Sequence, residues 1–198
     1  MAGMARPKIH DDDLRRRLVD EATAIVETDG LGTLSVRSVA RAASTSTTAV
    51  YSLFGSKDDL TRAVLVRALR DFTAAQREAG TEEPIEHVTA LGTAYVGWAL
   101  ANPRLYELMF GLSALGIEAT EETIAAGADA FAPLHEAVAA AISSGAFRPA
   151  DPTTVTASLW AQVHGASLLI LAGLFPDGAD PVPAISAIVD GWRVDPIR

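Results

Sequence analysis

Residues 35–60 read SVRSVARAASTSTTAVYSLFGSKDDL, and this stretch contains the clearest structural motif in the chain. Ser35 can cap a short helix that ends at Ala42, because a serine oxygen accepts hydrogen bonds from the free amides of a first helical turn. A tight turn at residues 44–45 follows, and Ser46 can cap a second short helix in the same way. The pattern predicts two short helices joined by a turn.

The second short helix is expected to run to about Leu53, and Gly55 ends it. Ser56 and Asp59 stand at capping-box spacing and predict a long helix over residues 57–78. Two short helices joined by a tight turn form a helix-turn-helix, whose second helix fits the major groove of DNA. We therefore expect this part of the chain to read DNA.

The side chains that this motif leaves exposed suit DNA contacts. Hydroxyl groups on the second helix can reach base edges, and cations near the ends of the flanking helices can neutralise phosphates. The predicted DNA-binding residues are Arg37, Thr47, Thr48, Tyr51, Ser52 and Lys57. The alternatives are a half-buried packing role for Tyr51, an incidental exposed position for Thr48 and a solvated surface charge for Lys57.

The net charge of −9 argues against a nucleic-acid partner until it is divided along the chain. The first obvious linker, at residues 79–84, is rich in small, acidic and helix-breaking residues. Residues 1–78 carry a net charge of +1, and residues 79–198 carry −10. We therefore predict a DNA-binding domain over 1–78 and a second domain over 79–198. The DNA-facing side should be locally basic through Arg6, Lys8, Arg37, Arg41 and Lys57.

Apolar residues recur at helical spacing along the whole chain, and no stretch alternates as a strand would. The fold class is therefore predicted to be all-α. A first helix should run from about Leu14 to Gly30, ahead of the short pair. In the second domain we expect helices over 84–101, 103–111, 118–144, 153–175 and 183–193.

Residues 14–72 resemble the DNA-binding domain of TetR/AcrR-type transcriptional regulators. The resemblance is carried in order and spacing by Gly30, Ser35-Val36, Val39-Ala40, Ala43, Ser46, Val50-Tyr51, Phe54 and Ser56-Lys57-Asp58-Asp59-Leu60. Two positions depart from the pattern, since Ser44 stands where the family usually has glycine and Thr45 where it has an aliphatic residue. Residues 84–198 more loosely resemble the family's Trp…His-Gly subgroup through Trp160, His164 and Gly165.

The resemblance implies a ligand-responsive repressor that binds a palindromic operator in double-stranded DNA as a homodimer. An activator, or a helical interaction module that does not bind DNA, are the alternatives. An unknown small-molecule effector, apolar or aromatic, is expected in the second domain. The predicted pocket consists of Tyr95, Trp98, Tyr106, Phe110, Phe131, Trp160 and His164, each of which could instead be a core residue.

The helix expected at 153–175 is apolar nearly all round, so it needs cover on both sides, and a second copy of the chain would supply it. The predicted dimer interface consists of Leu168, Leu171, Leu174, Phe175, Ile185, Ile188 and Trp192. Gly165, in the middle of this helix, indicates a close approach of another helix.

Catalytic and metal-binding motifs are missing from the sequence. The chain has no cysteine, which excludes disulfides and thiolate chemistry, and its four histidines lack Glu-x-x-His and His-Glu-x-x-His spacing. We therefore expect neither an enzyme nor a cofactor or metal. The most apolar run, Gly165 to Phe175, is short for a membrane span, and the N-terminus lacks an apolar signal core, so we expect a cytoplasmic protein.

Overall fold

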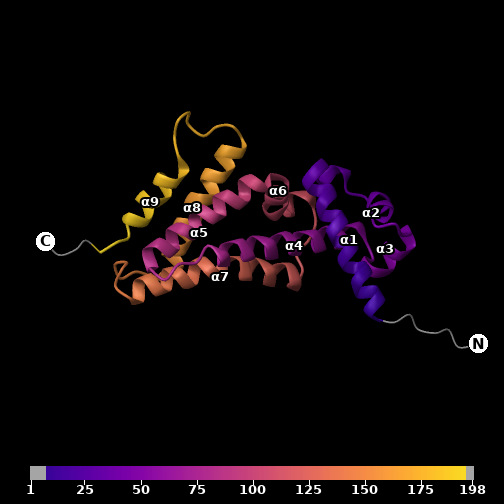
Figure 1. Ribbon diagram of the computed structural model, residues 1–198, viewed down its shortest axis with the longest axis horizontal. Helices are drawn as coiled ribbons and strands as arrows, with labels where there is room; N and C mark the ends of the chain where they lie inside the picture. The colour runs from indigo at the N-terminus through magenta and orange to yellow at the C-terminus, as the bar shows by residue number, and fades with distance from the viewer. Residues whose placement is uncertain (1–7, 195–198) are drawn as a thin grey trace, which may run out of the picture. The chain divides into compact units, whose positions relative to one another are not determined.

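The computed structural model describes residues 8–194, apart from the side chains of residues 8–10 and of Ser113, and this part of the chain is helical (Figure 1). The predicted all-α fold class is confirmed. The α-helices are α1 (Lys8–Asp29), α2 (Val36–Ala42), α3 (Thr47–Phe54), α4 (Lys57–Glu78), α5 (Pro84–Ala101), α6 (Pro103–Gly111), α7 (Glu121–Ser143), α8 (Pro152–Leu171) and α9 (Pro181–Asp190). Two 3₁₀ turns are η1 (Leu31–Thr33) and η2 (Ser113–Leu115).

The chain packs into two compact units that are not continuous in sequence. The first unit joins the chain up to Leu69 with Arg104–Ile124, and the second joins Arg70–Pro103 with Ala125–Arg198. The segment with α6 and η2 therefore packs with the helix-turn-helix, although it comes after the linker. The functional division at residue 78 remains a prediction, because compactness alone does not assign a role to either part.

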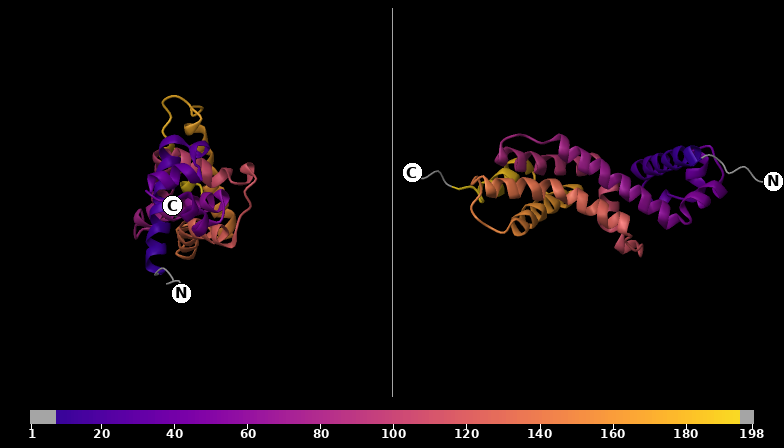
Figure 2. Two further views of the ribbon diagram at one scale, coloured as in Figure 1. Left: turned by 90° about the vertical axis from the view of Figure 1, so that its right-hand side faces the viewer. Right: turned by 90° about the horizontal axis from the view of Figure 1, so that it is seen from below.

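In the first unit, α1 packs against α2, α3 and η1 (Figure 2). The apolar stripes predicted for these helices supply its core. The fully or nearly fully buried side chains include Leu18, Val26, Leu34, Val39, Val50, Leu60 and Val64. This packing fixes α2 and α3 on the α1 framework, so the face of α3 away from α1 stays accessible.

In the second unit, α5 packs against α8 and α9, and α8 also packs against α9 (Figure 1). Two of these helices meet α5 at Gly92, where an added Cβ would lie 2.8 Å from Ile185 Cγ2 and 3.4 Å from Val163 Cγ1. The glycine thus lets α9 approach α5. At Gly165, in contrast, a Cβ would meet nothing within 4 Å, so the predicted close approach there is not seen within the chain.

Side-chain caps explain where the later helices differ from their predicted bounds. Asp151 accepts a hydrogen bond from the Thr154 amide at 2.9 Å, so α8 begins at the following proline. Asp180 caps α9 in the same way through the Val182 amide at 2.9 Å. At its other end α8 stops at Leu171, before Gly173 with its φ of +68°.

By length and apolar composition alone, helix α8 could cross a membrane. Of its most apolar 18-residue stretch, 33% is buried inside the chain. The core helix of a water-soluble protein passes the same test. Leu168, Leu169 and Leu171 on this helix are exposed apolar side chains.

Candidate nucleic-acid interface and effector site

The turn between α2 and α3 has a common helix C-cap geometry, but a serine takes the position that glycine usually occupies in it. The Thr45 amide donates to the Ala40 carbonyl at 2.8 Å, and the Ser44 amide donates to the Arg41 carbonyl at 3.1 Å. These two hydrogen bonds define a Schellman motif, which requires a left-handed residue between them. Ser44 takes that conformation with φ +52°. Ser44, which stands where the family usually has glycine, thus adopts the left-handed conformation itself.

Each helix of the motif begins at the serine that the sequence predicted. Ser35 accepts from the Ser38 amide at 3.0 Å, Ser46 accepts from the Ala49 amide at 3.1 Å, and Ser56 accepts from the Asp59 amide at 3.0 Å. At the Ser35 cap, the Ser38 hydroxyl oxygen in turn accepts a hydrogen bond from the Ser35 amide at 3.0 Å, which completes a capping box. The caps fix the start and direction of α2, α3 and α4.

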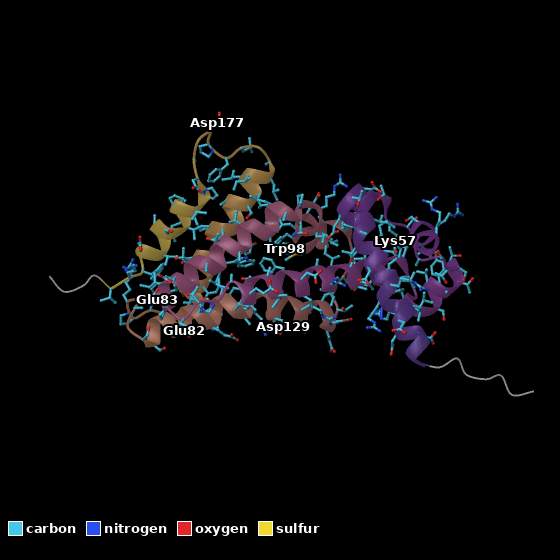
Figure 3. The ribbon with its side chains drawn as sticks, in the orientation of Figure 1. Lys57, Glu82, Glu83, Trp98, Asp129 and Asp177 are labelled. Carbon is cyan, nitrogen blue, oxygen red and sulfur yellow. The ribbon has the colours of Figure 1, made fainter. Side chains whose placement is uncertain are left out.

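All six side chains predicted to contact DNA are exposed, and they come from α2, α3 and the first residue of α4. Tyr51 is 54% exposed, whereas Val50 and Phe54 on the same helix are buried. Tyr51 is therefore not the half-buried packing residue that was the alternative to a DNA contact. Lys57 lies at the start of α4, where Figure 3 labels it.

The structure describes only some of the other basic side chains that were predicted to face DNA. Arg41 is exposed near the end of α2. Arg6 and the side chain of Lys8 lie outside the described residues. The exposed surface of the motif thus carries hydrogen-bonding groups on α3, and cations on α2 and at the start of α4. That combination suits base edges flanked by phosphates.

Arginines not singled out from the sequence attach the α6 segment to the rest of the first unit. Arg104 on α6 donates through Nη1 to the carbonyl of Thr28, at the C-terminal end of α1, and to that of Glu27 at 3.4 Å. Arg62 on α4 donates through Nε to the Glu118 carbonyl at 2.9 Å. Arginine suits helix C-termini because its charge favours their free carbonyls. A contact at a sequence separation of 76 leaves no local signal by which it could be predicted.

The second unit contains a connected set of aromatic side chains. Phe131 packs edge-to-face on Trp160 with ring centroids 5.9 Å apart, and Trp160 lies 6.0 Å from His164. The Tyr95 hydroxyl lies 3.1 Å from Nδ1 of His164. Burial lowers the pKa of His164, which favours a neutral ring. Five of the seven predicted pocket residues thus belong to this unit.

The other two predicted pocket residues belong to the first unit. Tyr106 is fully buried on α6, and its ring centroid lies 5.0 Å from that of Phe110. Phe72 was not predicted as a pocket residue, yet its ring lies 5.1 Å from that of Tyr95 and 5.2 Å from that of Trp98. Phe72 lies on α4 and is buried, and no sequence signal indicated these partners.

The residues predicted for dimerisation divide into exposed and buried ones. Leu168, Leu171 and Leu174 are 47%, 38% and 70% exposed, and Phe175, Ile188 and Trp192 are half-buried. Ile185 is buried at 4%, because it fills the space above Gly92 in the chain's own core. Its assignment to the interface is therefore corrected. Leu169, at 43% exposed, was not in the predicted set and adds to the apolar surface.

A helix-turn-helix with its second helix exposed and capped defines the chain as a DNA-binding protein of that class. The comparisons with known proteins narrow the class. The model described as "Bacterial regulatory proteins, tetR family" matches residues 18–64, and "Tetracyclin repressor-like, C-terminal domain" matches residues 88–191. The chain belongs to the TetR family of transcriptional regulators, and it is a DNA-binding regulator rather than an enzyme.

Named relatives agree with this assignment. HTH-type transcriptional regulator Rv1816 of Mycobacterium tuberculosis (strain ATCC 25618 / H37Rv) is 27% identical over 206 residues, which cover 89% of this chain and 84% of that protein. A protein of unknown function from Rhodococcus sp. RHA1 has a solved structure with a TM-score of 0.81 and 28% identity, covering 91% of this chain and 96% of that one. RolR, solved with the ligand resorcinol, has a TM-score of 0.70 and 16% identity, covering 96% and 92%, and shows the same fold.

Proposed function

We propose that this regulator is a ligand-responsive repressor that binds a palindromic operator as a homodimer. The observation that carries the proposal is the exposure of all six predicted DNA-contact side chains around the capped α3 helix. A helix-turn-helix dimer reads two half-sites whose centres lie about 34–36 Å apart along the duplex, or a multiple of that. The symmetry of the operator then mirrors the symmetry of the protein.

The exposed leucines of α8 and the following loop support the dimer. Leu168, Leu169 and Leu171 near the end of α8, and Leu174 just after it, are exposed apolar side chains, although α8 packs against α5 and α9. Burying one leucine side chain contributes about 1.5–3 kcal/mol. These leucines are 38–70% exposed, so pairing of two protomers would remove part of this apolar area from water and favour association. Gly165 lies in the same helix with open space at its Cβ position, so a partner helix can approach there.

Salt dependence tests the DNA contacts and separates a DNA-binding regulator from a protein-interaction module. Lys57→Ala should weaken operator binding and lower the slope of log affinity against log salt by about 0.9, because one phosphate contact is lost. Tyr51→Ala should weaken binding with less change in slope, because it removes a base-edge contact. Fluorescence anisotropy with a labelled operator measures both.

Arg77→Ala provides the control, because it removes one exposed positive charge from the far end of the same helix, α4. It should leave both the affinity and the salt slope near the wild-type values. Unchanged binding in both Lys57→Ala and Tyr51→Ala would show that this face does not touch DNA.

The aromatic set of the second unit is the proposed effector site. Phe131, Trp160 and His164 offer ring faces, and the hydrogen-bonded Tyr95 hydroxyl offers a polar anchor. A neighbouring cavity, which Tyr95 and the buried Gln76 help to line, has a volume of about 20 Å³. That space holds about one water molecule, whereas small-molecule sites measure about 300–1,000 Å³. Binding of an effector there therefore requires this core to open.

The chemistry of these groups favours a small apolar or aromatic molecule with at least one hydrogen-bonding group. RolR binds resorcinol, so a dihydroxybenzene is a reasonable first member of a screening panel. A ligand that acts as an inducer should raise the melting temperature and release labelled operator, and Trp160→Ala should abolish both effects. A panel of apolar and aromatic compounds that shifts neither quantity would contradict this part of the proposal.

A further inference from the structure

The first unit contains a larger cavity that the effector site does not include. It measures about 580 Å³, a volume typical of small-molecule sites. Its walls come from η1, the start of α4, α6 and the segment after α6, so it lies entirely within the unit that carries the helix-turn-helix. The wall includes Lys57, one of the residues predicted to contact DNA.

One part of the wall is apolar and incompletely covered. Leu115 is 50% exposed and Leu31 is half-buried, whereas Leu108 beneath them is 2% exposed. Covering such surface with an apolar group is favourable, because it removes apolar area from water. The apolar part of the wall therefore suits the hydrocarbon body of a ligand.

The charged part of the wall contains one cation without a partner. Within the part of the chain that the structure describes, the Lys57 ammonium has no ion pair, while Arg104 donates to the end of α1. Asp58 shares the first turn of α4, where the helix amides stabilise a carboxylate and disfavour a lysine charge. Glu107 is exposed on α6 and is solvated. The wall thus carries two cations, Lys57 and Arg104, and two carboxylates, and Lys57 is the cation at which a ligand anion can form an ion pair.

We propose that this cavity is a second ligand site, that it binds a small amphipathic carboxylate, and that the ligand's carboxylate competes with a DNA phosphate for Lys57. The hydrocarbon body lies against Leu31, Leu108 and Leu115, and the carboxylate lies beside Lys57. Binding is a property of the first unit alone. Its effect on the operator rests on the proposed DNA contact of Lys57, so binding and DNA release are measured separately.

The test compares three probes with one alkyl chain and different head groups: octanoate, octanol and octylammonium. Isothermal titration calorimetry on the full chain should detect octanoate, with octanol at least fivefold weaker and octylammonium weaker still. Octanoate should also raise the operator Kd at least fivefold. Preferred binding of octylammonium, or no binding of octanoate, would overturn the assignment.

Gly111→Phe supplies the decisive variant. Gly111 lines the cavity, and a Cβ placed on it meets nothing within 4 Å, so a phenylalanine can fill the space. Octanoate affinity should fall at least tenfold, and operator release by octanoate should disappear. Gly127→Phe is the matched control, since its Cβ position on α7 is equally open and lies outside this cavity. It should bind octanoate as the wild type does.

A second variant covers the case in which Gly111→Phe does not fold, which circular dichroism would show. Leu115→Asp places a carboxylate in the apolar wall from an exposed position and should also reduce octanoate affinity at least tenfold.

Unchanged octanoate binding in a folded Gly111→Phe or Leu115→Asp protein would overturn the site. Octanoate binding with the expected variant pattern but without operator release would overturn the competition at Lys57 and leave the site standing. Absence of any operator binding would instead contradict the proposed function.

Discussion

Ser44 shows how a single residue can carry strain at the centre of the DNA-binding motif. A left-handed conformation costs a residue with a Cβ about 1–2 kcal/mol, and Ser44 adopts it because the Thr45 and Ser44 amides both bond back to α2. Ser44→Gly removes that cost, although glycine gains entropy in the unfolded chain. We expect the free energy of unfolding to rise by about 0.5–1 kcal/mol in urea denaturation.

Ser44→Ala is the control, because alanine keeps the Cβ and lacks the hydroxyl. It should not stabilise the protein. An equal gain from alanine and glycine would show that the backbone conformation is not the source of the effect.

His164 connects the aromatic set to the pH dependence of stability. Burial lowers its pKa, so at pH values below about 6.5 the unfolded chain binds more protons than the folded chain does. The free energy of unfolding should therefore decrease as the pH falls below about 6.5. His164→Gln should flatten this part of the profile in thermal denaturation at several pH values.

Tyr95→Phe tests the cause of the shift, since it removes the hydroxyl near Nδ1 and keeps the ring that buries the histidine. It should retain the wild-type pH dependence. A profile flattened as much by Tyr95→Phe as by His164→Gln would assign the shift to the hydrogen bond instead of burial.

At the scale of the elements, local chemistry predicted most of what the structure contains. Serine caps and terminating glycines are encoded within four residues, so the bounds of α2, α3 and α4 agree with the sequence to within one residue. Helix α7 begins at Glu121, three residues later than predicted, and α8 ends at Leu171, four residues earlier. At α8 the apolar pattern continues past the end of the helix, whereas at α7 the Thr120 hydroxyl accepts from the Thr123 amide at 3.4 Å and so marks the later start.

Contacts between distant segments were the part that the sequence could not supply. The burial of Ile185 depends on a glycine 93 positions earlier, and the attachment of α6 to α1 depends on Arg104 reaching a backbone carbonyl. Neither contact leaves a periodic pattern. The exposed DNA-facing residues were predictable because a short motif determines them, whereas membership of the aromatic set depends on tertiary packing.

Gly92 and Gly97 provide a matched pair on one helix, α5. Alanine at Gly92 would place a Cβ 2.8 Å from Ile185 and force α9 outward, which should cost about 1–3 kcal/mol. At Gly97 nothing lies within 4 Å, so alanine should stabilise the helix by up to about 1 kcal/mol. Chemical denaturation of both variants measures the difference, and equal effects would contradict the close approach of α5 and α9.

On the scale of the whole molecule, the distribution of charge and apolar surface fits a two-part regulator. The first 78 residues carry a net charge of +1 and the remainder −10, so the charge of −9 does not oppose DNA binding by the motif itself. The acidity of the remainder should disfavour non-specific DNA contacts. Exposed apolar side chains on α8 are Trp160, Leu168, Leu169 and Leu171, and the proposed partner protomer would cover the leucines.

Replacing Leu171 and Leu174 with glutamate should convert the dimer into monomers. The two exposed positions would bring like charges together across a symmetric interface and remove apolar burial from both protomers. Light scattering after size-exclusion chromatography gives the mass. Ile124→Glu is the control, because Ile124 is 62% exposed outside α8 and should not affect assembly. A wild-type protein that is already monomeric would contradict the proposed interface.

Selection of bound DNA from a random pool tests the central proposal most directly, because one recovered site reports DNA reading, symmetry and half-site spacing together. We predict an inverted repeat whose half-site centres lie about one helical turn apart, or a multiple of it. Recovered sequences without an inverted repeat, or a pool that is not enriched above its starting composition, would contradict it.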